Sequence, residues 1–516
     1  MTSRHGKLSN LSRRQFLKTM GMSTAALVLS GKKKSCRKSV IYQGKRPNLI
    51  YVLADQLRYQ SLGYAGDPKA RTPHLDAMAS QGVSFTNAVS NTPLCAPHRA
   101  SLFTGKYTSS TGMVINELRM NPNHKCFGHV LTENGYETGY IGKWHLWSNR
   151  AGHHQEAESS YIPPDMHKYR LGFDGFWAAY NFNHHYYKAF YFKDEPKRIW
   201  VNGYEPDVQT DMAISFIREK AQSSKPFALF LSFGPPHPPW TKENVPESEY
   251  AKFENTEFPL PRTWSDIPDP YMDRFTDPVR WLEYYKPNIP EFQRIYYAMI
   301  ANLDWNIGRL FEAVEKTGIA ENTLIVFSSD HGEMFGAHGR IQKNTFYEES
   351  IRVPFLMRWP GIIPSGHKSD VCLGTPDIMP TILGLMGLPI PEEVEGKDLS
   401  HLALGKHGPE PDAALLQGMG HTYLWKDGFE WRGLRDKQYT YAVYRRDGSE
   451  LLFDNLNDPL QMKNLISNNK YKNIAETFRL KLKKKMEELN DTFEKCTWYK
   501  DHWTDGNRNI LKGAKG

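Results

Sequence analysis

The sequence predicts an α/β protein with a large, mostly parallel sheet sandwiched by helices, followed by a smaller C-terminal domain with an antiparallel sheet and a helix. Two observations predict the larger part: short apolar runs alternate with helical patterns, and the runs are continuous, as in strands buried on both faces. A change to alternating polar and apolar residues from about residue 400 predicts the smaller part. We therefore expect a leader (1–45), a main α/β domain (46–400) and a C-terminal domain (401–516).

The expected elements follow in order along the chain. A buried strand over 49–54 is followed by a helix that begins at Thr72-Pro73, where Thr is the N-cap and Pro suits the first turn, and that ends before Gly82. Next come a helix over 126–134, a strand over 138–141, a helix over 207–221, a strand over 227–233, a helix over 291–316 and a strand over 323–328. Strands over 438–444 and 450–453 and a helix over 474–490 follow, and the Pro-rich stretch 235–290 is expected to be a long surface excursion.

The positive net charge lies in the leader. The formal net charge is +8, from 65 Lys and Arg against 57 Asp and Glu. Eleven of the basic residues and none of the acidic ones lie in 1–45, so the rest of the chain carries a small negative excess. Nucleic-acid binding, which needs a basic surface, therefore loses its main support. A composition of 40% hydrophobic and 24% charged residues excludes a disordered or fibrous chain.

The leader resembles a bacterial twin-arginine export signal. Ser-Arg-Arg-Gln-Phe-Leu-Lys at 12–18 precedes an apolar stretch from Met20 to Leu29, which is shorter than the about 20 residues that span a membrane. Cys36 follows a lysine run, which argues against a lipoprotein anchor. The alternative is a basic disordered arm. We expect export by the twin-arginine translocase to the periplasm or the exterior of a bacterium, with no transmembrane span elsewhere.

The number and spacing of the cysteines do not predict a disulfide framework. The five positions, 36, 95, 126, 372 and 496, are too few and too scattered for a set of disulfides or a zinc cluster. If Cys95 has a chemical role, the three others beyond the leader cannot all pair. We expect no essential disulfide framework.

Ionisable residues come directly after four of the expected strands. They are Asp55, then Lys143 and His145, then His237, and then Asp330 and His331. Open α/β sheets bind ligands beyond the carboxyl ends of their strands, so these residues predict one polar site at that edge. Taken singly each has a structural explanation, since an Asp after a strand is often a helix N-cap.

The sequence predicts that a helix starts at Cys95. In Cys-Ala-Pro-His-Arg at 95–99, Pro97 is preset for the first turn, and the free backbone N–H groups of such a turn favour anions and nucleophiles. The structural alternative is that a lone Cys is a small buried hydrophobe.

The segment 95–105 resembles the C-x-P-x-R and T-G signature of the type I sulfatases of the alkaline phosphatase superfamily, in which the cysteine is oxidised to formylglycine. Further motifs of that family occur in the expected order at 53–56, 142–145, 236–238 and 329–332, with a lysine at 343. The resemblance covers about 46–500. It implies an exported sulfuric ester hydrolase, a sulfatase of polysaccharide degradation that acts on a sulfated carbohydrate. It also implies maturation by a formylglycine-generating enzyme or an anaerobic sulfatase-maturing enzyme.

The resemblance implies a divalent cation held by five residues: Asp55, Gln56, the modified Cys95, Asp330 and His331. We expect Ca²⁺ rather than Mg²⁺ or Mn²⁺, because oxygen ligands in irregular geometry suit Ca²⁺. Gln56 replaces the second aspartate that is commonest in the family, which removes one formal charge. His331 fills a slot held by Asn or His there, although a His nitrogen is an unusual ligand for a hard cation.

The resemblance also implies roles in the reaction. His237 would protonate the leaving alcohol, alone or with Lys343, and His145 would assist breakdown of a covalent sulfate intermediate. Lys143 and Lys343 would clamp the sulfate oxygens, and Arg99 would hold the formylglycine hydroxyl and its loop. His98 stands where Ser is frequent, which bears on the choice of maturation machinery more than on the chemistry.

Aromatic and histidine side chains are dense from 173 to 187. Such a cluster is more often packing than recognition. His184 and His185 are nevertheless candidates for substrate binding, because polar-tipped rings on loops above a sheet are typical ligand contacts.

Two other functions stay open on the sequence. A phosphodiesterase or phosphonate monoester hydrolase of the same superfamily would have a similar site. A catalytically silent carbohydrate-binding relative would keep Cys95 unmodified.

Overall fold

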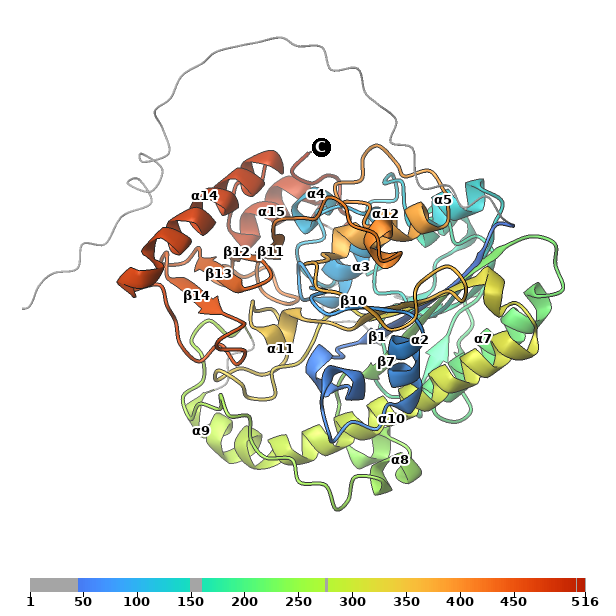
Figure 1. Ribbon diagram of the computed structural model, residues 1–516, viewed down its shortest axis with the longest axis horizontal. Coiled ribbons are helices and arrows are strands. Elements are labelled where there is room, and N and C mark those ends of the chain that lie inside the picture. The colour runs from blue at the N-terminus through green and yellow to red at the C-terminus, as the bar shows by residue number, and fades with distance from the viewer. Residues whose placement is uncertain (1–44, 149–159, 274–276, 507, 516) are drawn as a thin grey trace, which may run out of the picture. The chain divides into compact units, whose positions relative to one another are not determined.

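An eight-stranded sheet with helices on both faces organises the described residues (Figure 1). The computed structural model describes residues 45–148, 160–273, 277–506 and 508–515, so the predicted export signal lies outside them. The strand order is β10-β2-β9-β8-β1-β7-β3-β4. In chain order the strands are β1 (Asn48–Asp55), β2 (Val83–Phe85), β3 (Glu137–Lys143), β4 (Phe176–Tyr180), β7 (Phe227–Pro236), β8 (Thr323–Ser329), β9 (Phe355–Arg358) and β10 (His367–Ser369).

The sheet is mostly parallel, as predicted. β1 pairs in parallel with β7 and β8, and β3 pairs in parallel with β7 and β4. β9 runs antiparallel to both β8 and β2, which makes the sheet mixed on that side. The four strands predicted over 49–54, 138–141, 227–233 and 323–328 are confirmed as β1, β3, β7 and β8. They are adjacent in the sheet, in the order β8-β1-β7-β3.

Alternate side chains of β1 enter two separate cores. Leu49, Tyr51 and Leu53 pack in one core with helices α3 (Cys95–Thr104), α5 (Phe127–Glu133) and α12 (Thr375–Leu385). Ile50 and Val52 pack in the other with α2 (Pro73–Gln81), α7 (Glu205–Lys220) and α10 (Lys286–Lys316). Because successive side chains of a strand point to opposite faces, a continuous apolar run is what a strand between two helical layers requires.

Some elements differ from the predictions. α10 begins at Lys286 rather than at 291, because Pro287 lies in its first turn, where a missing N–H costs nothing, and a π-helical turn over Trp281–Tyr285 leads into it. The short strands β2, β9 and β10 and the helix α12 were not predicted. Between the end of β7 and the π-helical turn, the described part of the excursion carries only short helices, among them α8 (Glu247–Ala251) and α9 (Pro278–Arg280).

A smaller antiparallel sheet follows, as predicted, with the order β11-β12-β13-β14. Its strands are β11 (Ala414–Gly418), β12 (Trp431–Arg435), β13 (Tyr439–Tyr444) and β14 (Glu450–Asp454), and the helices α14 (Lys472–Glu488) and α15 (Cys496–Trp503) follow. Phe478 and Leu482 of α14 cover one face of this sheet, and Phe346 and Ile351 pack against the other. The domain boundary at residue 400 stays a prediction.

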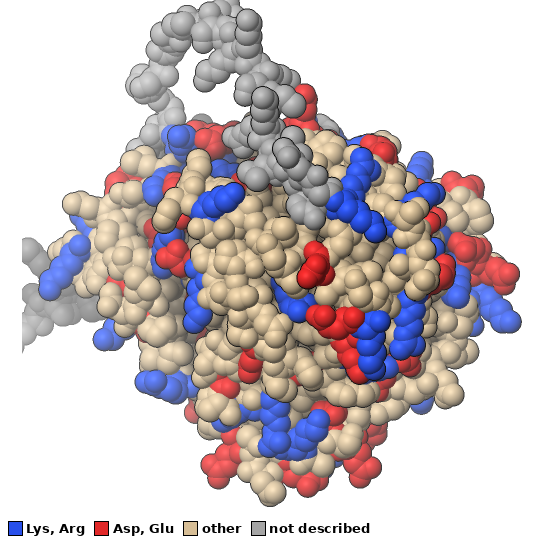
Figure 2. All heavy atoms as spheres, turned by 45° about the vertical axis from the view of Figure 1, so that its right-hand side comes forward, with Lys and Arg blue, Asp and Glu red and all other residues tan. Residues whose placement is uncertain are grey.

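The described residues also bear on the expectations about membrane spans, disulfides and surface charge. Among the described residues no helix is both long enough and apolar enough to cross a membrane. Cys95, Cys126, Cys372 and Cys496 are free and buried. Figure 2 shows Lys and Arg interspersed with Asp and Glu on the visible face, without a large basic patch.

Candidate active site

The carboxyl ends of the central strands bring the predicted site residues together. Asp55 is the last residue of β1, Lys143 is the last residue of β3, and Asp330 directly follows β8. The strand register aligns Ala54 with Ser329 and Asp55 with Pro236, so the exits of β8 and β7 flank that of β1. Asp55, Lys143 and Asp330 therefore lie together at one edge of the sheet.

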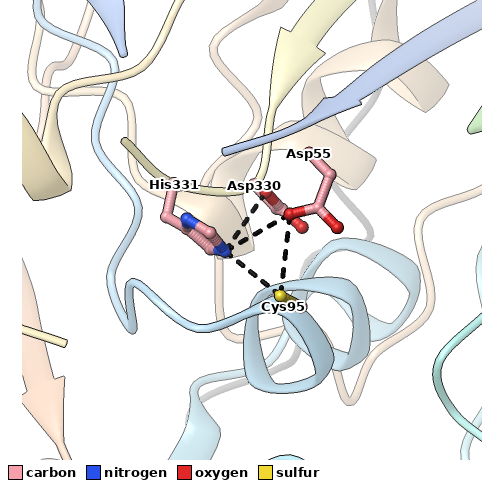
Figure 3. Close-up of side chains that lie close together, drawn as sticks. All are labelled: Asp55, Cys95, Asp330 and His331. Carbon is pink, nitrogen blue, oxygen red and sulfur yellow. Dashed lines mark hydrogen bonds and ion pairs between the residues drawn. The ribbon is translucent and has the colours of Figure 1, made fainter. Parts of the chain in front are cut away.

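Cys95 faces two carboxylates and an imidazole (Figure 3). One ligand atom from each of Asp55, Cys95, Asp330 and His331 lies within 4.8 Å of all the others, and all four residues are buried. Cys95 Sγ is 3.2 Å from His331 Nε2 and 3.7 Å from Asp55 Oδ1. The first turn of α3 presents Cys95, and the next N–H group, that of Ala96, donates to Asn116 Oδ1 at 3.0 Å.

Two lysines enter the same cluster. Lys143 Nζ forms a fully buried ion pair with Asp55. Lys343 Nζ lies 2.6 Å from Gln56 Oε1 and 3.4 Å from Cys95 Sγ. Burial alone would raise the pKa of Asp55, but the charges of Lys143 and Lys343 hold that pKa well below its usual range. The carboxylate is therefore ionised at neutral pH.

Arg99 connects α3 with β3, with β7 and with the residue that follows β8. Its guanidinium donates to Lys143 O at 2.8 Å and to Ser232 Oγ at 2.7 Å, and it pairs with Asp330 Oδ2 at 3.3 Å. The side chain is fully buried. With Lys143 and Lys343 it places three buried cationic groups beside the carboxylates of Asp55 and Asp330, and this excess of positive charge suits an anionic ligand.

His331 is held in its neutral form. Burial lowers its pKa to about 4 despite the neighbouring Asp330. Its Nδ1 lies 3.1 Å from Gly332 O and can only donate there, which leaves the lone pair of Nε2 facing Cys95. The structure thus makes His331 Nε2 available as an acceptor or a ligand.

Three more histidines were predicted above the cluster, and the structure brings His237 and His184 into contact. Their rings stack with centroids 3.7 Å apart. His237 Nδ1 contacts Pro238 O at 2.8 Å, and Tyr186 donates to His237 O at 2.7 Å. His185, by contrast, is exposed and does not join this stack.

His145 lies on the Lys143 side of the cluster. It adopts a left-handed backbone, with φ at 57°, and its Nε2 lies 3.7 Å from Glu117 Oε1. The ring of Phe182 is 5.0 Å from that of His145 and 5.1 Å from Lys143 Nζ. Phe182 therefore links the two residues from a loop that the sequence marked only as aromatic.

Sequence reasoning did not identify Ser232 or Glu333. Ser232 accepts from Arg99, and the buried Glu333 accepts from the side chain of Gln56. Glu333 directly follows the Ser-Asp-His-Gly motif, so a carboxylate next to a metal-site motif was the available signal. A buried cysteine at a helix start, among cations and next to two carboxylates at a sheet edge, suits the binding of an anionic ester.

Comparison with known proteins identifies the family. The family model described as Sulfatase matches residues 47–388, and the one described as N-sulphoglucosamine sulphohydrolase, C-terminal, matches 336–491. An ulvan-active sulfatase from Formosa agariphila is 37% identical over 503 residues, covering 94% of this chain and 90% of that protein. An endo-4-O-sulfatase from Bacteroides thetaiotaomicron is 30% identical over 486 residues, covering 83% and 89%.

Solved structures agree with this result. A Bacteroides fragilis protein assigned as the sulfatase yidJ has a TM-score of 0.74 at 32% identity, covering 92% of this chain and 99% of that one. A phosphonate monoester hydrolase from Silicibacter pomeroyi shares the fold at a TM-score of 0.69 and 20% identity, covering 86% and 95%. The chain belongs to the sulfatase family of the alkaline phosphatase superfamily. It is a sulfuric ester hydrolase, and the family generally uses formylglycine and a divalent metal.

Proposed function

We propose that this sulfatase removes sulfate from a sulfated carbohydrate, using a formylglycine formed from Cys95 and a divalent cation bound beside it. The observation that carries the proposal is the position of Cys95 Sγ, which lies within 3.7 Å of Asp55, His331 and Lys343. An unmodified thiol is a poor candidate for the nucleophile, because burial raises its pKa. Relatives named as an ulvan-active sulfatase and an N-acetylglucosamine-6-O-sulfatase support a carbohydrate substrate.

The donor set fits a hard cation. Asp55 and Asp330 supply carboxylate oxygens and His331 supplies Nε2. Gln56 would add an amide oxygen, which contacts the same Lys343 Nζ as Cys95 does. Three oxygen donors and irregular spacing favour Ca²⁺ over Mg²⁺ or Mn²⁺. When bound, the cation would neutralise charge on the sulfate and on the modified residue. Lys143 and Lys343, which contact Asp55 and Gln56 in this structure, would bind sulfate oxygens.

His237 and His145 would carry out different proton transfers. His237, stacked on His184 at the exit of β7, would protonate the leaving oxygen of the sugar. His145, at the exit of β3, would move a proton during release of sulfate. Arg99 orients the first turn of α3 through Ser232 and Asp330. His184 lies close enough to take part in substrate binding, whereas for His185 the exposed position offers only contact with the outer part of a long substrate.

The proposal includes maturation and export. The C-x-P-x-R segment over 95–99 would be the substrate of a formylglycine-generating or anaerobic sulfatase-maturing enzyme. The twin-arginine string at 12–18 would direct the protein through the twin-arginine translocase to the periplasm or the exterior of a bacterium.

Mass spectrometry of the peptide that contains position 95 tests the modification. Conversion of the thiol to the aldehyde lowers the mass by about 18 Da, unlike any step of the usual cysteine oxidation ladder. The matured enzyme is then assayed on a sulfated oligosaccharide, an aryl sulfate, an aryl phosphate and a phosphonate ester. Unmodified Cys95 in active enzyme contradicts the formylglycine, and a kcat/KM that is higher for phosphorus esters contradicts the substrate class.

A further inference from the structure

Glu333 is a buried carboxylate that the reaction described above does not use. Its side chain is completely inaccessible to solvent. Oε1 accepts hydrogen bonds from the backbone N–H groups of Phe335 at 2.9 Å and Gln342 at 2.8 Å. Oε2 accepts a hydrogen bond from Nε2 of Gln56. Both oxygens are therefore occupied by donors, which satisfy the buried carboxylate.

The two neighbours of the Gln56 amide determine which way the amide points. On one side stands Lys343 Nζ, a donor only, 2.6 Å from the amide, and on the other side stands Glu333, an acceptor. The reversed amide would oppose two donors at Lys343 and two acceptors at Glu333. Only the orientation with Oε1 toward Lys343 and the Cys95 cluster satisfies both contacts.

The backbone of Gln56 is held as firmly as its amide. Gln56 adopts a left-handed conformation, with φ at 68°, which is uncommon for a residue with a side chain. Its N–H donates to Asp330 Oδ1 at 3.0 Å, and its carbonyl accepts from Tyr296 OH at 2.7 Å. With the backbone held, rotation of the amide is the main remaining freedom at this position.

Glu333 also supports the turn that carries Lys343. Gln342 and Asn344, on either side of the lysine, have φ values of 65° and 67°. The Gln342 N–H donates to Glu333, and the Gln342 carbonyl accepts from Met334 N at 2.8 Å. One carboxylate thus contacts both the amide and the turn whose lysine meets that amide.

We propose that Glu333 is a positioning residue that orients the Gln56 amide, so that Oε1 rather than the NH₂ group faces the cation site. The inference rests on the cation site of the proposed function and adds a determinant of its affinity. An amide ligand can present either end to a cation, and only the oxygen binds it. A neighbouring carboxylate that accepts from NH₂ removes the non-binding orientation, as outer hydrogen-bond partners do at other metal sites.

The test compares Ca²⁺ affinity, measured by titration calorimetry on chelator-treated full-length protein, for wild type, Glu333→Gln and the double variant Gln56→Glu with Glu333→Gln. In Glu333→Gln the new amide keeps its oxygen toward the two backbone N–H groups and turns NH₂ toward the NH₂ of Gln56, so neither orientation of the Gln56 amide satisfies both this group and Lys343. We expect Kd for Ca²⁺ to rise about tenfold or more. In the double variant the carboxylate at position 56 accepts from the new NH₂ and keeps its other oxygen toward the cation, so the affinity returns to at least the wild-type level.

The matched control is Glu205→Gln. Glu205 is equally buried and accepts the amide of Gln209 at 2.6 Å, but it does not contact Gln56, so its Ca²⁺ affinity should be unchanged. A wild-type affinity in Glu333→Gln, or a loss that Gln56→Glu does not restore, overturns the inference. Gln56→Glu alone is measured beside the double variant, because the added carboxylate strengthens Ca²⁺ binding by itself. If Glu333→Gln fails to fold, the double variant decides alone: wild-type Ca²⁺ binding supports the pairing and its loss overturns it.

Asp55→Asn separates this inference from the proposed function. If Asp55→Asn weakens Ca²⁺ binding and Glu333→Gln does not, only the role of Glu333 is wrong. If Asp55→Asn leaves Ca²⁺ binding unchanged, the cation site itself is wrong, and the inference is overturned with it.

Discussion

The imidazole ring of His184 stacks on that of His237, with planes only 13° from parallel. Burial, followed by the positive charges of Lys343 and Lys143, holds the pKa of His237 well below its usual range. Burial and the neighbouring His237 do the same for His184. His237 is therefore neutral at pH 7 in the free enzyme, and an anionic ligand between the two lysines would favour its protonated form.

The first prediction concerns the leaving group. His237→Ala should reduce kcat/KM for a sugar sulfate by about 100-fold or more, because an alkoxide leaves poorly without a proton. An aryl sulfate, whose phenolate leaves unaided, should lose far less. Parallel assays on both substrates check this, with His407→Ala, an exposed histidine outside the site, as the control that should leave both rates unchanged.

The same assignment predicts a difference in pH dependence. Because the pKa of His237 is lowered, its protonated form disappears as the pH rises, so kcat/KM for the sugar sulfate should fall with rising pH. The aryl sulfate should show a flatter profile over the same range. If His237→Ala lowers kcat/KM equally for both substrates, and both substrates have the same pH profile, His237 does not protonate the leaving group.

The second prediction concerns the cation. Asp55→Asn and Asp330→Asn should each abolish detectable turnover and the increase in melting temperature that Ca²⁺ produces, since a ligand stabilises only the state that binds it. Wild type at a Ca²⁺ concentration 100 times Kd should gain about 2.7 kcal/mol. Thermal unfolding with and without chelator measures the effect. A chelated wild type with unchanged activity and melting temperature would refute the cation site.

The third prediction concerns Arg99. Arg99→Met leaves Asp330 without this partner and removes the donors to Ser232 and Lys143 O, so the free energy of unfolding should fall by about 3–5 kcal/mol. Ser232→Ala removes only one of these hydrogen bonds and should cost about 1 kcal/mol. Urea unfolding of both variants measures the two losses in the free energy of unfolding. If Arg99→Met costs no more than Ser232→Ala, the guanidinium does not hold α3 in place.

The fourth prediction concerns the stability contribution of His98. Burial lowers the pKa of His98 from 6.5 to about 3, and its Nδ1 lies 3.0 Å from Ser90 Oγ and 3.2 Å from Thr375 Oγ1. Between these two pH values the unfolded chain binds a proton that the native protein does not. The free energy of unfolding therefore falls as the pH falls through this window, by about 1.4 kcal/mol per pH unit from this group.

His98→Asn should remove that part of the slope between pH 6 and pH 4.5, measured by urea unfolding against wild type. Ser90→Ala is the control, because it removes a partner of His98 but keeps the imidazole and should keep the slope. An identical slope in wild type and His98→Asn would show that His98 titrates alike in both states.

Much of the site could be predicted from local sequence, because its main residues stand at strand exits. Asp55, Lys143 and Asp330 each follow an apolar run, and parallel strands end at one edge of the sheet. Cys95 could be placed at a helix start from Pro97 alone. The prediction was weaker for His184 and His185, since adjacent residues in a loop have no periodicity that tells which one turns inward.

By itself the sequence determined the α/β alternation, the four central strands and the polar residues at their ends, because strand and helix periodicities repeat within a few residues. Only the tertiary structure decided that Glu333 meets Gln56, that His184 stacks on His237, and that Phe346 packs under the C-terminal sheet. Glu333 and Gln56 are 277 positions apart in the chain. Contacts of that range depend on the packing of whole elements, and no local pattern of side chains encodes them.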